Sequence, residues 1–115
     1  MEIGTDIISV ARIKKQIKNK NFVKKIYTQT EIDYAGDKAF SCQHYAGFFA
    51  VKESVIKCFN GKGFFAEIEV NHLPSGKPFL VFYGETKKIF DNNFKISHIS
   101  ISHTSTDAIA VCVLE

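Results

Sequence analysis

The spacing of apolar side chains predicts helices in the first half of the chain. Residues 2–8 alternate with β-branched residues and predict a short strand before these helices. Helical spacing then begins after Ser9, whose hydroxyl suits a helix cap. Two predicted helices begin near Val10 and at Thr30–Glu31. Two further predicted helical segments span residues 22–27 and 41–59. The last of these is apolar on most of its circumference, which is typical of a central buried helix.

The pattern changes after the glycine-rich stretch 60–63, which ends this helix. The segments expected to form strands are 65–73, 79–83, 96–102 and 108–114. The turn residues 74–78 join the first two strands as a hairpin, and residues 84–92 predict a short helix. The sequence therefore predicts an α+β fold, in which an antiparallel sheet packs against one long central helix. We expect a single domain over residues 1–115.

The composition supports a buried core and argues against a membrane protein. Of the 115 residues, 45% are hydrophobic and eleven are Phe. No apolar run approaches the ~18 residues that span a bilayer, and the N-terminus lacks the pattern of a signal peptide. The three cysteines show no CxxC spacing, so we interpret them as reduced core residues. These features predict a cytoplasmic protein.

Positive charge is concentrated near the N-terminus. Residues 7–30 contain seven basic residues and no acidic one, while the rest of the chain holds eight basic and twelve acidic residues. One interpretation is a helix face that serves solubility. The other is a surface that binds an anionic partner.

Charged residues interrupt the apolar helix 41–59. Glu53 and Lys57 lie four residues apart and share one face, and Lys52 points about 100° away. An ordinary ion pair between Glu53 and Lys57 is one explanation. The apolar neighbours favour a second explanation, in which the Glu53 carboxylate is largely buried. Burying a carboxylate costs several kcal/mol unless a cation or strong hydrogen-bond donors contact it. Such a cost suggests that Glu53 has a function.

Asp6 raises the same question within the first strand. Asp is disfavoured in strand interiors, and Gly4 lets another backbone or a ligand come close. Asp6 and Glu53 could converge if the strand packs on the helix. Two carboxylates without a neighbouring His or Cys suit Mg²⁺, and Lys57 would then neutralise a phosphate.

A polar turn near the C-terminus is a third candidate. His103 and Thr104 follow a predicted strand and begin a turn rich in hydroxyl groups, which can present donors to a phosphate. An ordinary turn has the same composition. We interpret His44 and His72 as ordinary residues, since neither lies in such a context.

Together, these segments resemble the holo-acyl-carrier-protein synthase family, the small bacterial 4′-phosphopantetheinyl transferases. The matching motifs, in chain order, are Gly4-Thr5-Asp6-Ile7 with Arg12, Phe49-Ala50-Val51-Lys52-Glu53-Ser54-Val55-Ile56-Lys57, Gly76-Lys77-Pro78, and Ser100 to Thr104. Their order, separations and the total length agree with the family along the whole chain.

The resemblance implies an activity and assigns residues to it. The 4′-phosphopantetheine arm of coenzyme A would move to a serine of apo acyl carrier protein, in fatty acid biosynthesis, releasing adenosine 3′,5′-bisphosphate. Asp6 and Glu53 would bind Mg²⁺ together with the diphosphate, and Glu53 or a metal-bound water would accept the serine proton. Lys57 would act in catalysis and, with His103 and Thr104, contact the diphosphate. The nucleotide would lie on Gly76, Lys77 and Pro78.

The resemblance also implies partners and shows two departures. Acyl carrier proteins are acidic, so the predicted docking residues are Arg12, Lys14, Lys15 and Lys18. A homotrimer with active sites between subunits is expected. Phe48 stands where many relatives carry an Arg that contacts the nucleotide end of coenzyme A. Residues 60–63 replace a Gly-Thr-Gly loop, and Lys62 could supply the missing charge.

Two alternatives remain at this stage. A nucleic-acid-binding module could use the basic segment, although no aromatic residues alternate with its lysines and the remainder is acidic. A Mg²⁺-dependent nucleotide hydrolase could use the same carboxylates with water as the nucleophile. Our preferred prediction, the transferase, involves neither nucleic acid nor a membrane.

Overall fold

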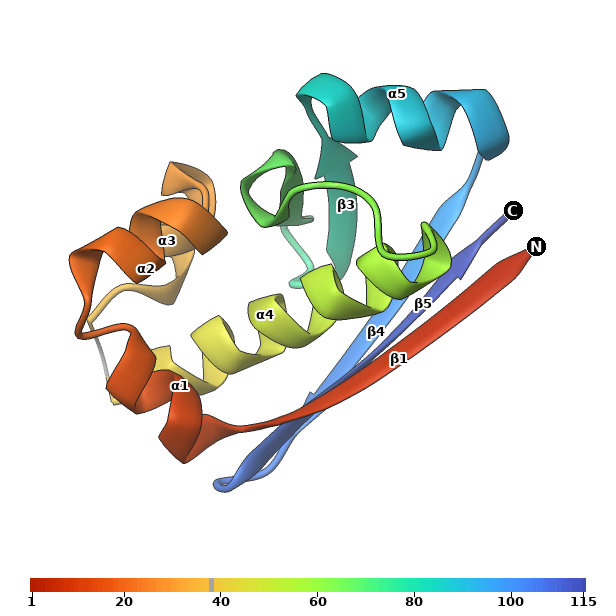
Figure 1. Cartoon of the computed structure of the whole chain (residues 1–115). Coiled ribbons are helices and arrows are strands. Elements are labelled where there is room, and N and C mark those ends of the chain that lie inside the picture. The colour runs from red at the N-terminus through yellow and green to blue at the C-terminus, as the bar shows by residue number, and fades with distance from the viewer. Residues whose placement is uncertain (38) are drawn as a thin grey trace.

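A long helix lies across a three-stranded antiparallel sheet, and a separate hairpin and a short helix cover its other side (Figure 1). The computed structural model describes residues 1–37 and 39–115. Its elements, in chain order, are β1 (Glu2–Ser9), α1 (Val10–Gln16), α2 (Lys20–Ile26), α3 (Gln29–Ala35), α4 (Ser41–Cys58), the 3₁₀ turn η1 (Phe65–Glu67), β2 (Ile68–His72), β3 (Pro78–Phe82), α5 (Gly84–Asn93), β4 (Ser97–His103) and β5 (Asp107–Leu114). The predicted α+β fold with one central helix is confirmed.

The main sheet has the order β1-β5-β4, so the last strand lies between the first strand and β4. Asp6 pairs with Ala110, and Ile8 pairs with Ala108. Because side chains alternate between the faces of a strand, Ala108, Ala110 and Cys112 share the face that packs on α4, and all three are fully buried. These small side chains let the helix lie close to the sheet.

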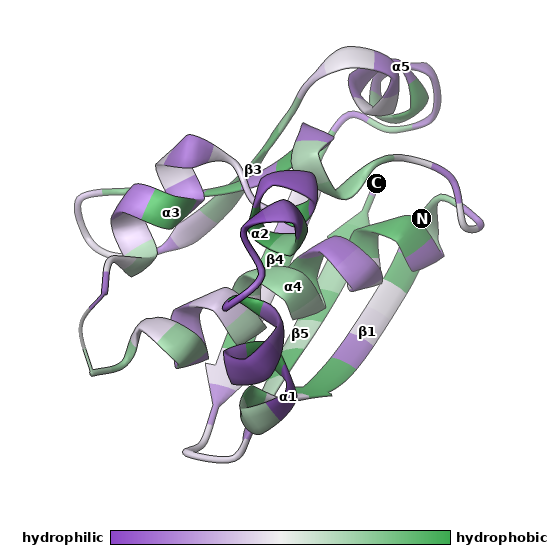
Figure 2. Cartoon of the chain, turned by 60° about the vertical axis from the view of Figure 1, so that its left-hand side comes forward, coloured by the Kyte–Doolittle hydropathy of each residue, from purple (hydrophilic) through white to green (hydrophobic). Residues whose placement is uncertain are grey.

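The outer face of this sheet is apolar and exposed. Ile3, Ile7 and Ile109 point away from α4, and their exposed fractions are 71%, 66% and 41%. Ile7 and Ile109 are directly paired. Green bands on β1 and β5 in Figure 2 mark apolar residues of the two strands, and β1 also carries pale and purple bands. Such a patch on a small protein indicates a contact surface.

The hairpin forms its own two-stranded sheet, β2-β3, and does not extend the main one. The strand predicted over 65–73 is shorter than expected: β2 begins at Ile68, because residues 65–67 form η1. The turn closes where the backbone N–H of Gly76 donates to the carbonyl of Leu73. Gly76 adopts a φ of 91°, which residues with a side chain rarely adopt.

Two helix starts illustrate how caps fix the boundaries. The Ser9 hydroxyl accepts a hydrogen bond from the backbone N–H of Arg12, as predicted. The third helix begins differently from the prediction, because its cap is Thr28 and not Thr30. Thr28 and Glu31 form a capping box, in which each side chain accepts from the other residue's backbone N–H.

A fully buried ion pair joins α3 to α4. Glu31 and Lys52 both have an exposed fraction of 0%, and the Lys52 Nζ lies 2.8 Å from the Glu31 Oε1. Lys52 also donates to the carbonyls of Phe65 and Ile68, and Glu31 Oε2 accepts from the backbone N–H of Val70 at 2.7 Å. The pair thus connects two helices to the start of the hairpin. Of the three charges in α4 considered above, Lys52 is the buried one.

No helix in the described ranges is both long and apolar enough to cross a lipid bilayer.

Removing one member of the buried pair should destabilise the fold strongly. Lys52→Met leaves the Glu31 carboxylate without its cation, and we expect the free energy of unfolding to fall by about 3–5 kcal/mol in urea denaturation. The double variant with Glu31→Leu should recover much of that loss. The matched control is Lys87→Met on α5, whose exposed pair with Asp91 is worth about 0.5 kcal/mol. Equal losses for the two lysine variants would contradict the structural role of the pair.

Candidate active site

Asp6 and Glu53 come together where β1 packs on α4. Gly4, Asp6 and Ile8 point toward the helix, since alternate residues of β1 share that face. At Gly4 the two elements are as close as backbones allow, because a Cβ built there would lie 2.0 Å from the carbonyl oxygen of Ser54. This close approach brings Asp6 beside the turn of α4 that carries Glu53.

The pKa of Glu53 reflects the charged groups around it. Burial raises the pKa of Glu53, and the negative charge of Asp6 raises that pKa further. Lys57 and Arg12 act in the opposite direction and lower it. Glu53 therefore lies within reach of one carboxylate and two cations, which come from β1, α1 and its own helix.

Lys57 binds the strand, and it does not pair with Glu53. Its ammonium group donates to the carbonyl of Thr5 at 2.9 Å and to the Asp6 Oδ1 at 3.4 Å. The ordinary Glu53–Lys57 ion pair considered from the sequence is therefore not formed. Lys57 is exposed and Glu53 is half-buried, so the buried charge inferred from the apolar neighbours is only partly present at Glu53.

Asp6, Glu53 and Lys57 form a first group of candidate site residues. Its two carboxylates fit a hard cation that completes its coordination with ligands from outside the protein. In the described part of the chain, no group of three or more His, Cys, Asp or Glu residues could enclose a metal ion. Two adjacent carboxylates are what Mg²⁺ uses when waters and phosphate oxygens complete its shell. The like-charge repulsion between Asp6 and Glu53 is the kind that a divalent cation relieves.

The other predicted site residues form a second group. Gly76, Pro78 and His103 line a cavity of about 170 Å³ that also includes His44 and Phe48. Asp6, Glu53 and Lys57 are not among its lining residues, and β5 separates β1 from β4, which carries His103. The chain therefore holds the predicted residues in two separate places.

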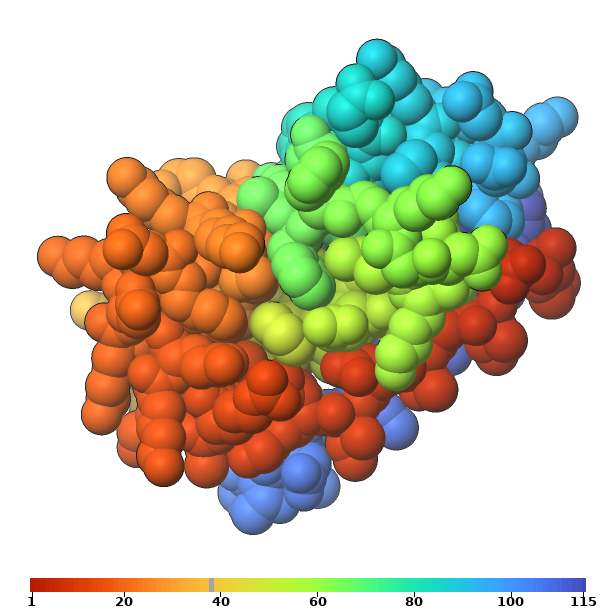
Figure 3. Space-filling view, in the orientation of Figure 1, coloured from red at the N-terminus to blue at the C-terminus, as the bar shows by residue number. Residues whose placement is uncertain are grey.

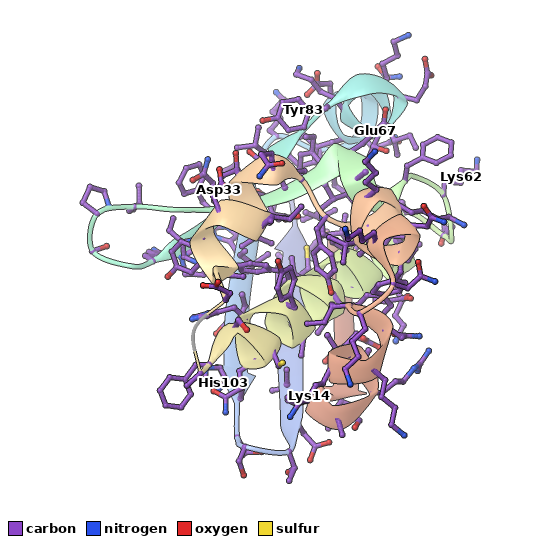
Figure 4. All side chains as sticks on the ribbon, turned by 90° about the vertical axis from the view of Figure 1, so that its left-hand side faces the viewer. Lys14, Asp33, Lys62, Glu67, Tyr83 and His103 are labelled. Atoms are coloured by element: carbon purple, nitrogen blue, oxygen red, sulfur yellow. The ribbon has the colours of Figure 1, made fainter. Side chains whose placement is uncertain are left out.

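Three residues predicted to contact the ligand do not line this cavity: Lys62, Lys77 and Thr104. Lys77 is exposed and lies beside a different hollow, next to Phe79 and His98. The Thr104 hydroxyl accepts from the backbone N–H groups of Thr106 and Asp107, so it organises its own turn. Lys62 lies far from His103 in Figure 4 and beside α5. It is therefore not placed to supply a charge near Phe48.

The basic residues of α1 and of the turn that follows it form an open surface beside the first group. Arg12, Lys14, Lys15 and Lys18 are all exposed, and Ile13 anchors the helix in the core. Figure 2 shows α1 and α2 as a largely hydrophilic region. In Figure 3 these helices, in red and orange, lie next to the part of α4 that reaches the same face.

The sequence interpretation missed two histidines of the second group. His44 and His72 line the same cavity as His103, although 28 and 31 residues separate them along the chain. No local motif marks either residue. The turn of the hairpin, which places His72 opposite α4, was the signal that could have suggested the contact.

Comparisons with known proteins match the chain almost end to end. Residues 2–112 match the model of the 4′-phosphopantetheinyl transferase superfamily. The holo-[acyl-carrier-protein] synthase of Clostridium botulinum (strain Eklund 17B / Type B) is 43% identical, and the match covers 98% of this chain and 95% of that protein.

Two solved structures of the same enzyme type share the fold. The Helicobacter pylori holo-[acyl-carrier-protein] synthase, in complex with coenzyme A, has a TM-score of 0.85 at 32% identity and covers 98% of this chain and 99% of its own. The Bacillus anthracis protein, in complex with CoA (3′,5′-ADP), has a TM-score of 0.79 at 34% identity, with coverages of 98% and 94%.

The carboxylate pair can be tested without any assay of function. Asp6→Asn removes one negative charge beside Glu53 and leaves Lys57 free to act on it, so the pKa of Glu53 should fall. Carboxyl carbon shifts of Glu53, followed by NMR during a pH titration, measure this change. Asp91→Asn on α5 is the control and should leave the pKa where it was. If Asp6→Asn has no effect either, the two side chains do not meet.

Proposed function

Because this chain belongs to the 4′-phosphopantetheinyl transferase superfamily, we propose that it transfers the 4′-phosphopantetheine group of coenzyme A to a serine of apo acyl carrier protein. The products are holo acyl carrier protein and adenosine 3′,5′-bisphosphate, and the reaction serves fatty acid biosynthesis. Residues 1–115 act as one catalytic domain in the cytoplasm. The observation that carries this proposal is the convergence of Asp6 and Glu53.

Asp6 and Glu53 are the residues that would hold Mg²⁺. Both offer oxygen ligands, and their mutual repulsion favours a divalent cation between them. When bound, this ion would neutralise the diphosphate and polarise the phosphorus that the serine attacks.

Lys57, Glu53 and the residues of the second group have separate roles in the proposed reaction. Lys57 is tied to β1 by the Thr5 carbonyl, which holds its ammonium group beside Asp6, where it can contact the diphosphate. Glu53 is a candidate acceptor for the serine proton, because burial and Asp6 raise the pKa of its carboxyl. His103, Gly76 and Pro78 bind the coenzyme from the cavity on the other side of β5. Lys77 and Thr104 follow Gly76 and His103 in the chain but line other hollows.

A homotrimer reconciles the two groups of residues. One subunit holds the carboxylates and the cavity apart, so an active site between subunits can combine the first group of one with the second group of another. The exposed apolar face around Ile3, Ile7 and Ile109 offers the area for such contacts. The mass of the protein measured by light scattering tests this assembly, and a stable monomer would contradict it.

The basic surface of α1 and the turn after it is the docking site for the acidic carrier protein. Its charges come from Arg12, Lys14, Lys15 and Lys18, and Arg12 also acts on Glu53. Docking beside the carboxylates would deliver the serine to the reacting phosphorus. Complementary charge chiefly accelerates association and orients the partner.

Transfer can be tested by mass spectrometry of apo acyl carrier protein incubated with coenzyme A, Mg²⁺ and this chain. We expect the carrier protein to gain one phosphopantetheine. Glu53→Gln should lower the rate roughly a hundredfold or more, because a ligand and a negative charge are lost from the metal site. The circular dichroism spectrum should stay unchanged, since Glu53 is only half-buried.

The control for this variant is Glu85→Gln on the exposed start of α5, which should transfer at the normal rate. Full activity of Glu53→Gln would remove Glu53 from the metal site. Bisphosphate released from coenzyme A without any carrier protein would identify a hydrolase instead.

Charge reversal on α1 should slow docking. Lys14→Glu places a negative charge before an acidic partner, and we expect the association rate in stopped-flow measurements to fall roughly tenfold at low salt. The difference should shrink at 1 M salt, where the Debye length is about 3 Å. Lys87→Glu on α5 is the matched control. An unchanged rate for Lys14→Glu at low salt would exclude docking on this helix.

A further inference from the structure

Three of the four histidines of the chain line one cavity. The cavity lies between α3, α4, the β2-β3 hairpin and the end of β4, and its titratable residues are Tyr34, His44, His72 and His103. No Lys, Arg, Asp or Glu lines it within residues 1–37 and 39–115. Any charge that forms in this cavity therefore comes from an imidazole or from a ligand.

The rings are arranged as open aromatic surfaces. Tyr34 and His72 stack in parallel, with ring centroids 3.7 Å apart and an angle of 3° between their planes. His44 meets Tyr34 edge-on at 5.3 Å, and Phe48 lies 6.0 Å from the same ring. Phe48 is 2% exposed and forms the floor. Such stacked rings offer a face to a purine base.

The imidazoles are available to a ligand. The Nε2 of His98, outside the cavity, lies 3.0 Å from a Glu115 carboxylate oxygen. In contrast, the ring nitrogens of His44, His72 and His103 form no hydrogen bond with another residue that the structure describes. Gly76 adds an exposed backbone, since nothing lies within 4 Å of where its Cβ would be.

The surroundings of His44 and His72 disfavour a positive charge on their rings. Burial lowers the pKa of His44, and His103 lowers it further. Burial also lowers the pKa of His72, and His44 lowers that pKa further. The titratable groups that face them are Tyr34 from α3 and His103 from β4, and the nearest cation in the hairpin turn, Lys77, is exposed beside another hollow. A phosphate would reverse these shifts, because a negative charge stabilises the imidazolium.

We propose that His44 and His72 bind the 3′-phosphate of the coenzyme that the proposed function places in this pocket, with the base against the Tyr34–His72 stack. The proposal rests on the proposed function, which supplies the ligand. It assigns recognition of the 3′-phosphate to a pair of titratable side chains. Affinity for that phosphate consequently rises as the pH falls, and binding takes up protons.

A metal ion is the main competing occupant of a histidine cluster, and the geometry does not support it. No described set of three or more potential ligands is close enough to enclose an ion. The aromatic floor and the parallel stack have no role in such a site, whereas both contribute to a nucleotide site.

Calorimetry on the full chain with adenosine 3′,5′-bisphosphate and with adenosine 5′-monophosphate tests the proposal. At pH 6.5 we expect the bisphosphate to bind roughly tenfold more tightly, as is typical of charge-assisted hydrogen bonds. At pH 8.5 the preference should fall below about threefold, because the imidazoles no longer hold a proton. Titrations in buffers of different ionisation enthalpy should show uptake of about one proton per nucleotide.

Variants assign the effect to the two residues. His44→Gln and His72→Gln should each remove most of the preference at pH 6.5, and His44→Arg should retain it at pH 8.5. Lys62→Gln is the control and should behave as the unmodified protein, since it lies beside α5. A pH-independent preference, or one that survives both glutamine variants, would overturn the proposal.

The same samples separate this proposal from the proposed function. If carrier protein is modified but the bisphosphate is not preferred, the transferase stands and the histidine pocket is wrong. If the pH-dependent preference is found but no carrier protein is modified, the pocket stands as a nucleotide site and the transfer reaction fails.

Discussion

The buried pair of Glu31 and Lys52 is the constraint on which the arrangement of this protein depends. A charge without access to water must find its partners inside, and Lys52 finds a carboxylate and two backbone carbonyls. This requirement fixes how α4 is rotated about its axis. Since successive residues of a helix differ by about 100°, Glu53 is turned out of the core and toward β1.

The same helix contributes to two separate groups of candidate site residues. Its C-terminal half presents Glu53 to Asp6, while its N-terminal half contributes His44 and Phe48 to the cavity beside the hairpin. The strand order β1-β5-β4 keeps the two apart. The apolar outer face of the sheet therefore has a double importance in the proposed trimer, since it hides exposed isoleucines and brings complementary groups together.

Local patterns predicted the fold well, and contacts between distant residues decided what they missed. The alternation in β1, the Ser9 cap and the long apolar helix are properties of short segments, so they could be inferred directly. Glu53 was singled out because its charge was expected to be buried, and the structure bears out that burial only in part. The buried charge is Lys52, whose partner lies 21 residues earlier on a helix with an unexpected cap at Thr28. His44 and His72 have no local signature, because only the hairpin brings them together.

Gly4 gives the carboxylate pair a property that its ligands alone do not. Where a Cβ would stand, the Ser54 carbonyl oxygen is 2.0 Å away, so main chain rests directly on main chain. The main-chain separation of the two acids is therefore set by backbone packed on backbone, and only their side-chain rotamers adjust the distance between the carboxylates. A larger residue at position 4 would push β1 away from α4 and carry Asp6 away from Glu53. The closeness of the two acids is in this way inherited from a missing side chain.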